Sequence, residues 1–268
     1  MDTYIVNGLN RLSGSIRIQG AKNSVLPILS ASILNAGESV IHNCPALRDV
    51  DAALDILRHL GCGATRRGDT VYINSSSLDK CSVPPALMHE MRSSVIFLGA
   101  ILARTGEAHV AHPGGCELGA RPIDLHLNAL AAMGAHISEE KDSVVCKAGE
   151  LKGCNIHLPF PSVGATENVM IAATGAKGQT VLTNAAREPE IADLQRFLNA
   201  MGAKVQGAGS STIVIDGVST LKSCSHRVMP DRIAAATYMA CCAGAGGRIE
   251  LCDARIEDLR SVCSVFEK

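Results

Sequence analysis

A repeat of about seventy residues constrains this chain more than any other feature of its sequence. One glycine of each repeat precedes a short β-prone segment, and the spacings along the series are 69, 72 and 69 residues: Gly37, Gly106, Gly178 and Gly247. A second glycine follows a helical pattern of apolar residues, with spacings of 73 and 68 residues: Gly61, Gly134 and Gly202. Repeats of this length are supersecondary units that bury their apolar faces by stacking on one another. The sequence therefore predicts three whole helix–strand–helix–strand units, with a further strand between units.

The first unit gives the clearest pattern of helices and strands. Apolar residues at helical spacing predict helices over 24–34 and 49–60, and β-prone runs predict strands over 39–42 and 70–74. Two short strands, over 4–6 and 14–18, are expected before this unit. A fourth unit starts at residue 230 and reaches its second helix over 256–266, and its strand 248–252 is expected to have no sheet to join. We therefore expect an α/β protein that breaks off within a structural unit.

The composition argues against several functions. A net charge of −1, the absence of Trp and 3% aromatic residues are atypical of a nucleic-acid-binding surface. The 11 cysteines include no Cys-x-x-Cys pair and follow no signal peptide, which favours reduced thiols and a cytoplasmic location. No apolar run is long enough to cross a bilayer, and no spacing of His and Cys indicates a metal site. We expect no cofactor, no metal, no membrane and no nucleic-acid partner.

The segment 112–124 must be a loop, because three glycines and two prolines in thirteen residues do not fit a helix or a central strand. It holds the thiol of Cys116 and, five residues later, the guanidinium of Arg121. A nearby cation favours a thiolate or a poised proton donor. The alternative is a hairpin loop with an incidental cysteine, and the sequence alone leaves both open.

Three of the four units place a cation near the expected start of their first helix. These starts are Lys22, Arg92, Thr166 and Arg232. A helix N-terminus presents unpaired N–H groups and a positive dipole, so phosphate or carboxylate is the implied ligand. The alternative is that these cations are solvated surface charges.

Several other polar residues near the helix starts have plainer expected roles. His126 and Glu188 are expected to orient a neighbour or cap a helix, and Asp231 is expected to be an N-cap. Asp49, Asp51 and Glu190 are expected to be helix-start charges, and most cysteines other than Cys116 to be small core residues.

Four motifs together resemble the family of UDP-N-acetylglucosamine enolpyruvyl transferases, or 1-carboxyvinyltransferases, which have the EPSP synthase-like fold. They are Gly-Ala-Lys-Asn at 20–23, the cysteine loop at 113–122, Ser-Val-Gly-Ala-Thr at 162–166 and Ala-Arg-Glu-Pro-Glu-Ile at 186–191. The resemblance implies an inside-out α/β barrel of two lobes with six repeats, or roughly 420 residues. Residues 22–229 would form a complete three-repeat lobe that carries the cysteine loop. Residues 1–21 would supply N-terminal strands to the second lobe, and 230–268 its incomplete start.

The resemblance also implies a reaction. Members transfer the enolpyruvyl group of phosphoenolpyruvate to the 3-hydroxyl of UDP-N-acetylglucosamine and release phosphate, the first committed step of peptidoglycan synthesis. Cys116 would be the general acid and the point where fosfomycin attaches. Lys22 and Arg121 would hold phosphoenolpyruvate, with Asn23 beside them, and Arg92 would help hold the UDP-sugar. The nucleotide part would contact two short segments: Arg121, Pro122, Ile123, Asp124 and Leu125, then Ser162, Val163 and Gly164.

The chain departs from the family pattern in two places. Phe160 stands where many relatives have a lysine that contacts the uridine side. The family's carboxylate that takes the sugar hydroxyl proton, and a further arginine on phosphoenolpyruvate, would lie beyond residue 268. The missing repeats would be needed for the full site. A second hypothesis is therefore a non-catalytic lobe that binds UDP-sugar without turnover.

Overall fold

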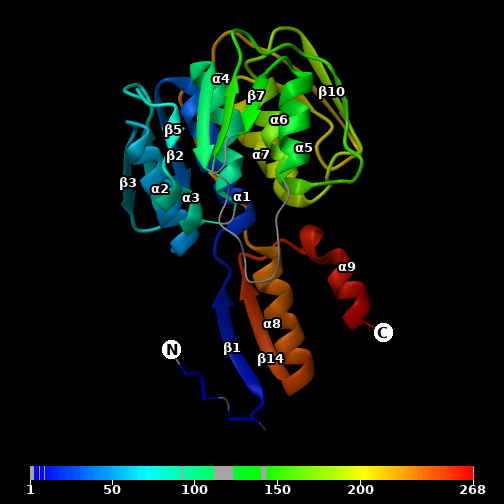
Figure 1. Ribbon diagram of the computed structural model, residues 1–268. Coiled ribbons are helices and arrows are strands. Elements are labelled where there is room, and N and C mark those ends of the chain that lie inside the picture. Colours follow the sequence, from blue (N-terminus) through cyan, green and yellow to red (C-terminus); the bar gives the residue numbers. More distant parts are fainter. Residues whose placement is uncertain are drawn as a thin grey trace.

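The computed structural model describes residues 3–5, 7–8, 10–91, 93–111, 123–139 and 143–267. Figure 1 shows a broad upper lobe joined to a narrow lower unit, and both chain ends lie beside the lower unit. The lobe holds the three predicted repeats, and the lower unit holds the first strand and everything after the third repeat.

The repeats of the lobe have matching series of elements. The first contains α1 (Lys22–Ala31), the 3-10 helix η1 (Ser32–Asn35), β2 (Glu38–His42), α2 (Arg48–His59), β3 (Gly63–Arg67), β4 (Thr70–Asn74) and β5 (Ser82–Val83). The second contains α3 (Pro85–Glu90), η2 (Ser94–Ile96), α4 (Phe97–Thr105), β6 (Glu107–Ala111), α5 (Asp124–Ala132), β7 (His136–Glu139), β8 (Ser143–Lys147) and β9 (Asn155–His157). The third contains α6 (Val163–Ala173), β10 (Gln179–Thr183), α7 (Pro189–Ala200), β11 (Lys204–Gln206), β12 (Thr212–Asp216) and β13 (Cys224–Arg227).

Each repeat donates its last strand to a neighbouring repeat. Within the described residues the lobe has three four-stranded sheets, in the orders β13-β2-β4-β3, β5-β6-β8-β7 and β11-β12-β10-β9. In each sheet the donated strand pairs in parallel: β5 with β6, β9 with β10, and β13 with β2. Because β13 of the third repeat returns to the first, the three units form a closed ring. The predicted strand between units is therefore the element that joins them.

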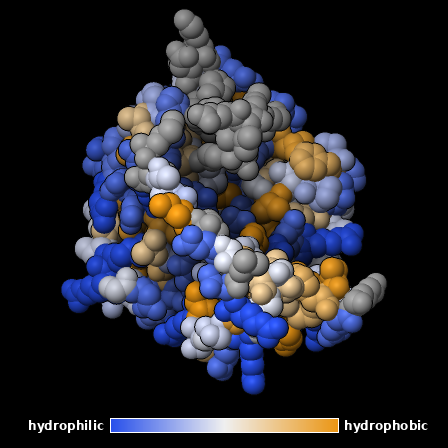
Figure 2. Space-filling model, turned by 90° about the horizontal axis from the view of Figure 1, so that it is seen from below, coloured by the Kyte–Doolittle hydropathy of each residue, from blue (hydrophilic) through white to orange (hydrophobic). Residues whose placement is uncertain are grey.

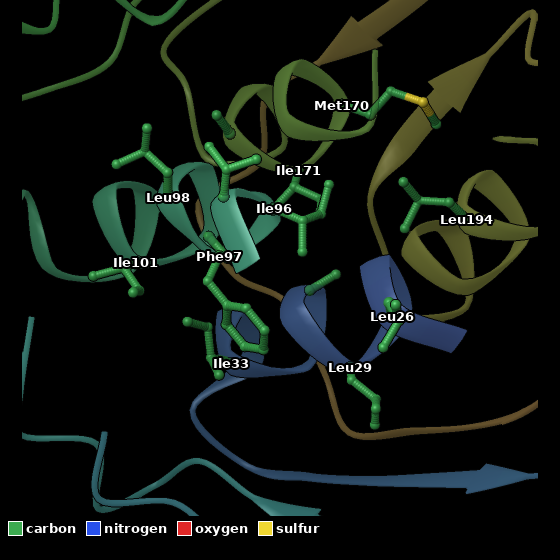
Figure 3. Packing of buried hydrophobic residues seen from close by; sticks show 14 of the residues in the cluster. Leu26, Leu29, Ile33, Ile96, Phe97, Leu98, Ile101, Met170, Ile171 and Leu194 are labelled. Carbon is green, nitrogen blue, oxygen red and sulfur yellow. The ribbon is translucent and has the colours of Figure 1, made fainter. Parts of the chain in front are cut away.

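One helix from each repeat, α1, α4 and α6, lies at the centre of the lobe. Helix α4 contacts both α1 and α6, and Figure 3 shows their side chains interleaved around Phe97, which is fully buried. All residues of α1 from Ser24 to Ala31 are buried, as are those of α6 from Ala165 to Ala173. A helix that is apolar on all sides is stable only inside a protein. The sheets and second helices therefore surround these three helices, as an inside-out arrangement requires.

The lower unit has a small core of its own. β1 (Leu12–Arg17) pairs in parallel with β14 (Gly247–Cys252), and α8 (Arg232–Ala245) and α9 (Ile256–Phe266) complete it. Its buried residues are Ile18, Ala235 and Leu259. Two expectations were wrong: residues 4 and 5 form no strand, and the strand near 248–252 pairs with β1 rather than standing alone. β14 pairs because the donated-strand pattern of the lobe recurs here, with β1 in the role of β5.

The domain boundaries at residues 21 and 229 remain a proposal, which the separate core of the lower unit supports. Among the described residues, none of the helices has both the length and the apolar composition needed to span a bilayer. Helix α8 is nevertheless apolar and largely exposed, since only Ala235 of its fourteen residues is buried.

Candidate functional site

Four helix starts meet where the lobe joins the lower unit. Lys22 is the first residue of α1, and its ammonium pairs with the carboxylate of Asp49 in the first turn of α2. The backbone N–H of Lys22 also donates to Asp231, at 3.4 Å. Asn23, the next residue, is exposed. The two Gly-Ala-Lys-Asn residues expected to bind phosphoenolpyruvate therefore lie at this junction, which is marked in Figure 1 by the passage from β1 into α1.

Asp231 and Arg232 extend this junction to α8 and α7. The Asp231 carboxylate accepts from the N–H groups of Ile233 and Ala234, at 2.8 and 3.0 Å, so its predicted role as an N-cap is confirmed. The Arg232 Nε donates to both carboxylate oxygens of Glu190, at 3.0 and 3.2 Å, in the first turn of α7. Lys22 and Arg232 are thus ion-paired rather than only solvated, and an anionic ligand would compete with Asp49 and Glu190 for them.

The starts of α5 and α6 approach each other through a histidine and a glycine. Ser162 caps α6 by accepting from the N–H of Ala165, at 3.4 Å. A Cβ on Gly164 would lie 3.1 Å from Cε1 of His126, so the absence of a side chain lets the imidazole lie against the first turn of α6. Ile123 is the N-cap residue of α5, Asp124 and Leu125 are its first two residues, and α5 packs against α6. The structure therefore brings the 123–125 and 162–164 segments together.

Asn168 fixes the position of this histidine, and sequence analysis did not single it out. Its Oδ1 accepts from the N–H of Gly99 at 2.8 Å, and its Nδ2 donates to the carbonyl of Val95 at 2.9 Å. The same Nδ2 lies 2.6 Å from Nδ1 of His126. A signal was present, since Asn168 directly precedes the apolar stretch 169–173, and a buried amide needs specific hydrogen-bond partners.

Glu167 was also missed, although it lies beside the candidate residues. It is 6% exposed, and its Oε1 has no hydrogen-bond partner among the described residues. Burial, with the nearby Glu190 and Glu188 carboxylates, raises the pKa of Glu167 well above its usual range. Glu188 precedes α7 but makes no side-chain capping bond, so its expected capping role is not seen. Glu167, Glu188 and Glu190 therefore place three carboxyl groups close together, and the pKa of the most deeply buried one is raised.

Thr166 differs from its expected position. α6 begins at Val163, so Thr166 lies inside the helix rather than at its start. Its hydroxyl donates to the carbonyl of Ser162 at 2.7 Å and accepts from the N–H of Ala186 at 3.0 Å. Because both bonds are internal, Thr166 joins the Ser-Val-Gly segment to the 186–191 motif instead of binding a ligand.

Some of the predicted site lies outside the described residues: Arg92, Cys116, Arg121 and Pro122. Phe160, at the position expected to contact a uridine, is 58% exposed. The prediction that most other cysteines are small core residues was wrong, since only Cys44, Cys62 and Cys146 are buried, while six are half-buried and Cys241 is exposed. Burial raises the pKa of each of the three buried thiols to about 11. Figure 2 views the molecule from below, on the side of the lower unit, and shows a hollow near the centre with both hydrophilic and hydrophobic residues around it.

Comparison with known proteins gives a consistent result. The family model described as EPSP synthase (3-phosphoshikimate 1-carboxyvinyltransferase) matches residues 6–268. UDP-N-acetylglucosamine 1-carboxyvinyltransferase 2 of Caldanaerobacter subterraneus is 48% identical over 268 residues, which are 100% of this chain and 64% of that protein. UDP-N-acetylglucosamine 1-carboxyvinyltransferase 1 of Symbiobacterium thermophilum is 49% identical, over 92% of this chain and 58% of that protein. The chain thus spans less than two thirds of the length of these curated relatives.

Solved structures of similar fold include two enolpyruvyl transferases. The enolpyruvyl transferase NikO from Streptomyces tendae matches 88% of this chain and 56% of its own, with a TM-score of 0.78 and 26% identity. The EPSP synthase from Acinetobacter baumannii matches 91% of this chain and 56% of its own, with a TM-score of 0.71. At 23% identity, this match is evidence only that the two proteins share a fold. The predicted fold, a lobe of α/β repeats of the EPSP synthase type, is confirmed.

Proposed function

Because this chain belongs to the EPSP synthase family of carboxyvinyl transferases, we propose that it serves the transfer of the enolpyruvyl group of phosphoenolpyruvate to the 3-hydroxyl of UDP-N-acetylglucosamine. The observation that carries this choice of acceptor is the 48% identity, over the whole chain, to a curated protein with that name. Phosphate is the second product, and the reaction commits UDP-N-acetylglucosamine to peptidoglycan in the cytoplasm.

The chemistry is an addition followed by an elimination. The sugar oxygen attacks C2 of phosphoenolpyruvate and loses its proton to a base, while the methylene carbon C3 takes a proton from an acid. The resulting tetrahedral ketal then loses phosphate as C3 gives a proton back, which restores the double bond. Cys116 is proposed as the acid because its loop also carries Arg121. A cation near the thiol stabilises the thiolate that remains after the proton is transferred.

Lys22, Arg121 and Asn23 are proposed to hold phosphoenolpyruvate. Lys22 contributes a cation at the first residue of α1, where the helix dipole also favours an anion. Its present partner, Asp49, is 23% exposed at the side chain, so the pair is open to competition by a more highly charged phosphate. Lys22 is therefore proposed as catalytic as well as binding, because charge that develops on the departing phosphate is stabilised there.

The UDP-sugar is proposed to lie between the starts of α5 and α6. Val163 and Gly164 supply N–H groups in the first turn of α6, and Ser162 is the N-cap residue beside them. Residues 121–125 are proposed to contact the nucleotide part, and Arg92 is proposed to help hold the UDP-sugar. Exposed Phe160 is proposed to replace the missing lysine contact with apolar surface against the uracil ring.

Further protein is proposed to complete the site. Large apolar side chains on α8 and α9 are exposed: Ile233, Tyr238, Ile256, Val265 and Phe266. The relatives extend beyond the matched region, and a second lobe packed on α8 would bury this surface and supply the base for the sugar hydroxyl. The alternative function is a lobe that binds UDP-sugar without turnover, and it does not require a second lobe that supplies this base.

The test mixes residues 1–268 with both substrates, beside a full-length relative, and measures phosphate and the mass of the sugar product. Calorimetry with UDP-N-acetylglucosamine alone measures binding. Residues 1–268 alone should bind UDP-N-acetylglucosamine without phosphate release, because the base is proposed to lie in the second lobe. A chimaera that joins residues 1–268 to the remaining C-terminal part of the relative should form enolpyruvyl-UDP-N-acetylglucosamine, and binding without release in that chimaera would support the binding lobe. Transfer to shikimate 3-phosphate in place of the sugar nucleotide would contradict the choice of acceptor.

A further inference from the structure

A cluster of three metal-ligand side chains lies on the second sheet of the lobe, apart from the helix starts described above. Its members are Cys81, Glu107 and His109. Within the described residues it is the group of His, Cys and acidic side chains whose ligand atoms come close enough to share a metal ion: all three lie within 4.8 Å of one another. None of these residues has a part in the proposed transferase reaction.

The sheet itself builds this cluster. Glu107 and His109 are two residues apart on β6, so their side chains leave the same face of the sheet. Cys81 comes immediately before β5, and its carbonyl accepts from the N–H of His109 at 2.8 Å. Parallel pairing of β5 with β6, in the register Ser82↔His109, then holds the thiol beside the imidazole.

The cluster is open to solvent on one side. The side chains of His109 and Glu107 are 41% and 35% exposed, and Cys81 is half-buried. His109 also lines a surface pocket together with Ser82 and His59. A hydrated ion can therefore reach the ligand atoms without opening the fold.

The kinds of ligand select the kind of metal. A thiolate, an imidazole and a carboxylate are the set that Zn²⁺ takes, whereas Mg²⁺ and Ca²⁺ take oxygen ligands. Bonds of 2.0–2.3 Å in a tetrahedral site separate the ligand atoms by about 3.3–3.8 Å. Glu107 Oε1 and His109 Nε2 are already 2.6 Å apart, so modest side-chain rotations would bring all three atoms to this spacing.

The ammonium group of Lys147 contacts this cluster where a metal ion would be expected to bind. Its Nζ lies 2.6 Å from Oε1 of Glu107, directly across the β6–β8 pair. The lysine side chain is 59% exposed and can move into water when an ion arrives.

We propose that Cys81, Glu107 and His109 bind a thiophilic divalent cation, Zn²⁺ in the first instance, with water as the fourth ligand and Lys147 as its competitor. The ion would fasten the residue before β5 to β6. β5 has only two residues and is the shortest strand of this sheet, so a metal bond beside it would add a further attachment to β6.

The experiment uses chelator-treated protein and Co²⁺ as a spectroscopic substitute for Zn²⁺. Residues Cys241 and Cys242 are first replaced by serine, because two adjacent thiols on exposed α8 can bind cobalt themselves. We expect a thiolate-to-cobalt charge-transfer band at a stoichiometry of about one, displaced by Zn²⁺. Cys81→Ser should abolish the band, and His109→Gln should weaken binding by about tenfold or more.

Two further variants separate this site from adventitious binding. Lys147→Gln should strengthen binding, since it removes the competing cation without touching a ligand. Cys154→Ser, at another half-buried cysteine, should leave binding unchanged. The proposal is overturned if no charge-transfer band appears, if Cys81→Ser keeps the band, or if Cys154→Ser removes it. Circular dichroism of each variant shows that its fold is intact.

Discussion

Nδ2 of Asn168 lies 2.6 Å from Nδ1 of His126, and the backbone of η2 and α4 decides which way the amide is turned. The N–H of Gly99 must meet the amide oxygen, and the carbonyl of Val95 must meet the amide nitrogen. The nitrogen is therefore the atom beside His126, and Nδ1 of the imidazole accepts a hydrogen bond from it. The ring then carries its proton on Nε2, on the side of Gly164 and the start of α6.

Asn168→Asp should reverse this arrangement. A carboxylate oxygen in place of Nδ2 accepts instead of donating, so Nδ1 of His126 should gain a proton. Ring ¹⁵N chemical shifts of His126 measure the change directly, and binding of UDP-N-acetylglucosamine should weaken in parallel if Nε2–H contacts it. A spectrum of His126 that keeps an unprotonated Nδ1 in the variant would contradict the argument.

The close approach of α4 and α6 gives a second prediction. A Cβ on Gly99 would lie 2.6 Å from Oδ1 of Asn168 and 2.8 Å from its backbone carbonyl oxygen. Because the clash includes backbone, Gly99→Ala should force the helices apart and lower the free energy of unfolding by about 1–3 kcal/mol. Gly175→Ala, where a Cβ meets nothing within 4 Å, is the matched control for thermal or urea unfolding. Equal stability of the two variants would contradict this account.

The repeat predicted the fold because the regular spacing of glycines marks supersecondary units of about seventy residues. Units of this size bury their apolar faces by stacking on one another. What it did not predict was how they join. Hairpin strands β3, β7 and β11 were missed, since Gly63–Arg67 is polar and shows little alternation. β14 was expected to lack a partner because its partner β1 lies about 230 residues earlier in sequence, and pairing over that distance leaves no local pattern.

The candidate site was predictable only where a motif marks it. Lys22, Ser162 and Asp231 lie at helix starts, where residue type and position carry the signal. Asn168 acts through contacts with the second repeat, and Glu167 is set apart by burial and by carboxylates more than twenty residues later in the chain. Such contacts exist only after folding. The cluster around Cys81 was missed for the same reason, because its ligands come from two strands and the Glu-x-His spacing alone is common.

Asp193 predicts how stability depends on pH. Burial acts to raise its pKa, but hydrogen bonds from His226, Ser24 and the Met229 N–H prevail and lower it from 3.8 to about 2. A depressed carboxyl pKa stabilises the fold above pH 3.8, and that contribution, about 2 kcal/mol, is lost as the pH falls toward 2. Asp193→Asn should therefore be less stable than the parent at pH 6 and approach it at pH 2. Urea midpoints at both values measure this, and a gap independent of pH would contradict it.

Thiol reactivity should differ sharply between cysteines. Burial raises the pKa of Cys44, Cys62 and Cys146 to about 11, so roughly one thiol in a thousand is ionised at pH 8. Iodoacetamide followed by peptide mass spectrometry should label Cys116 and exposed Cys241 within minutes and leave these three unmodified. Fosfomycin with UDP-N-acetylglucosamine should label Cys116 alone, and an even spread of adducts would refute the proposed role of its loop.

Lys22 gives the last prediction, which separates a ligand-binding cation from a structural ion pair. Its ammonium contacts Asp49, and the side chain is 44% exposed, so either role fits the geometry. If Lys22 binds phosphoenolpyruvate, Lys22→Ala should weaken that binding by about tenfold or more, as measured by calorimetry with UDP-N-acetylglucosamine present.

Asp49→Asn should strengthen the same binding, because it removes the carboxylate that competes for the ammonium. Lys177→Ala, at a lysine with 75% exposure and only a 3.8 Å contact to Glu150, controls for the loss of one positive charge. If the pair is only structural, Lys22→Ala and Asp49→Asn should lower the unfolding midpoint alike and leave the affinity for phosphoenolpyruvate unchanged. Opposite effects of the two substitutions on affinity therefore identify Lys22 as the anion-binding residue, since a shared structural role moves both in the same direction.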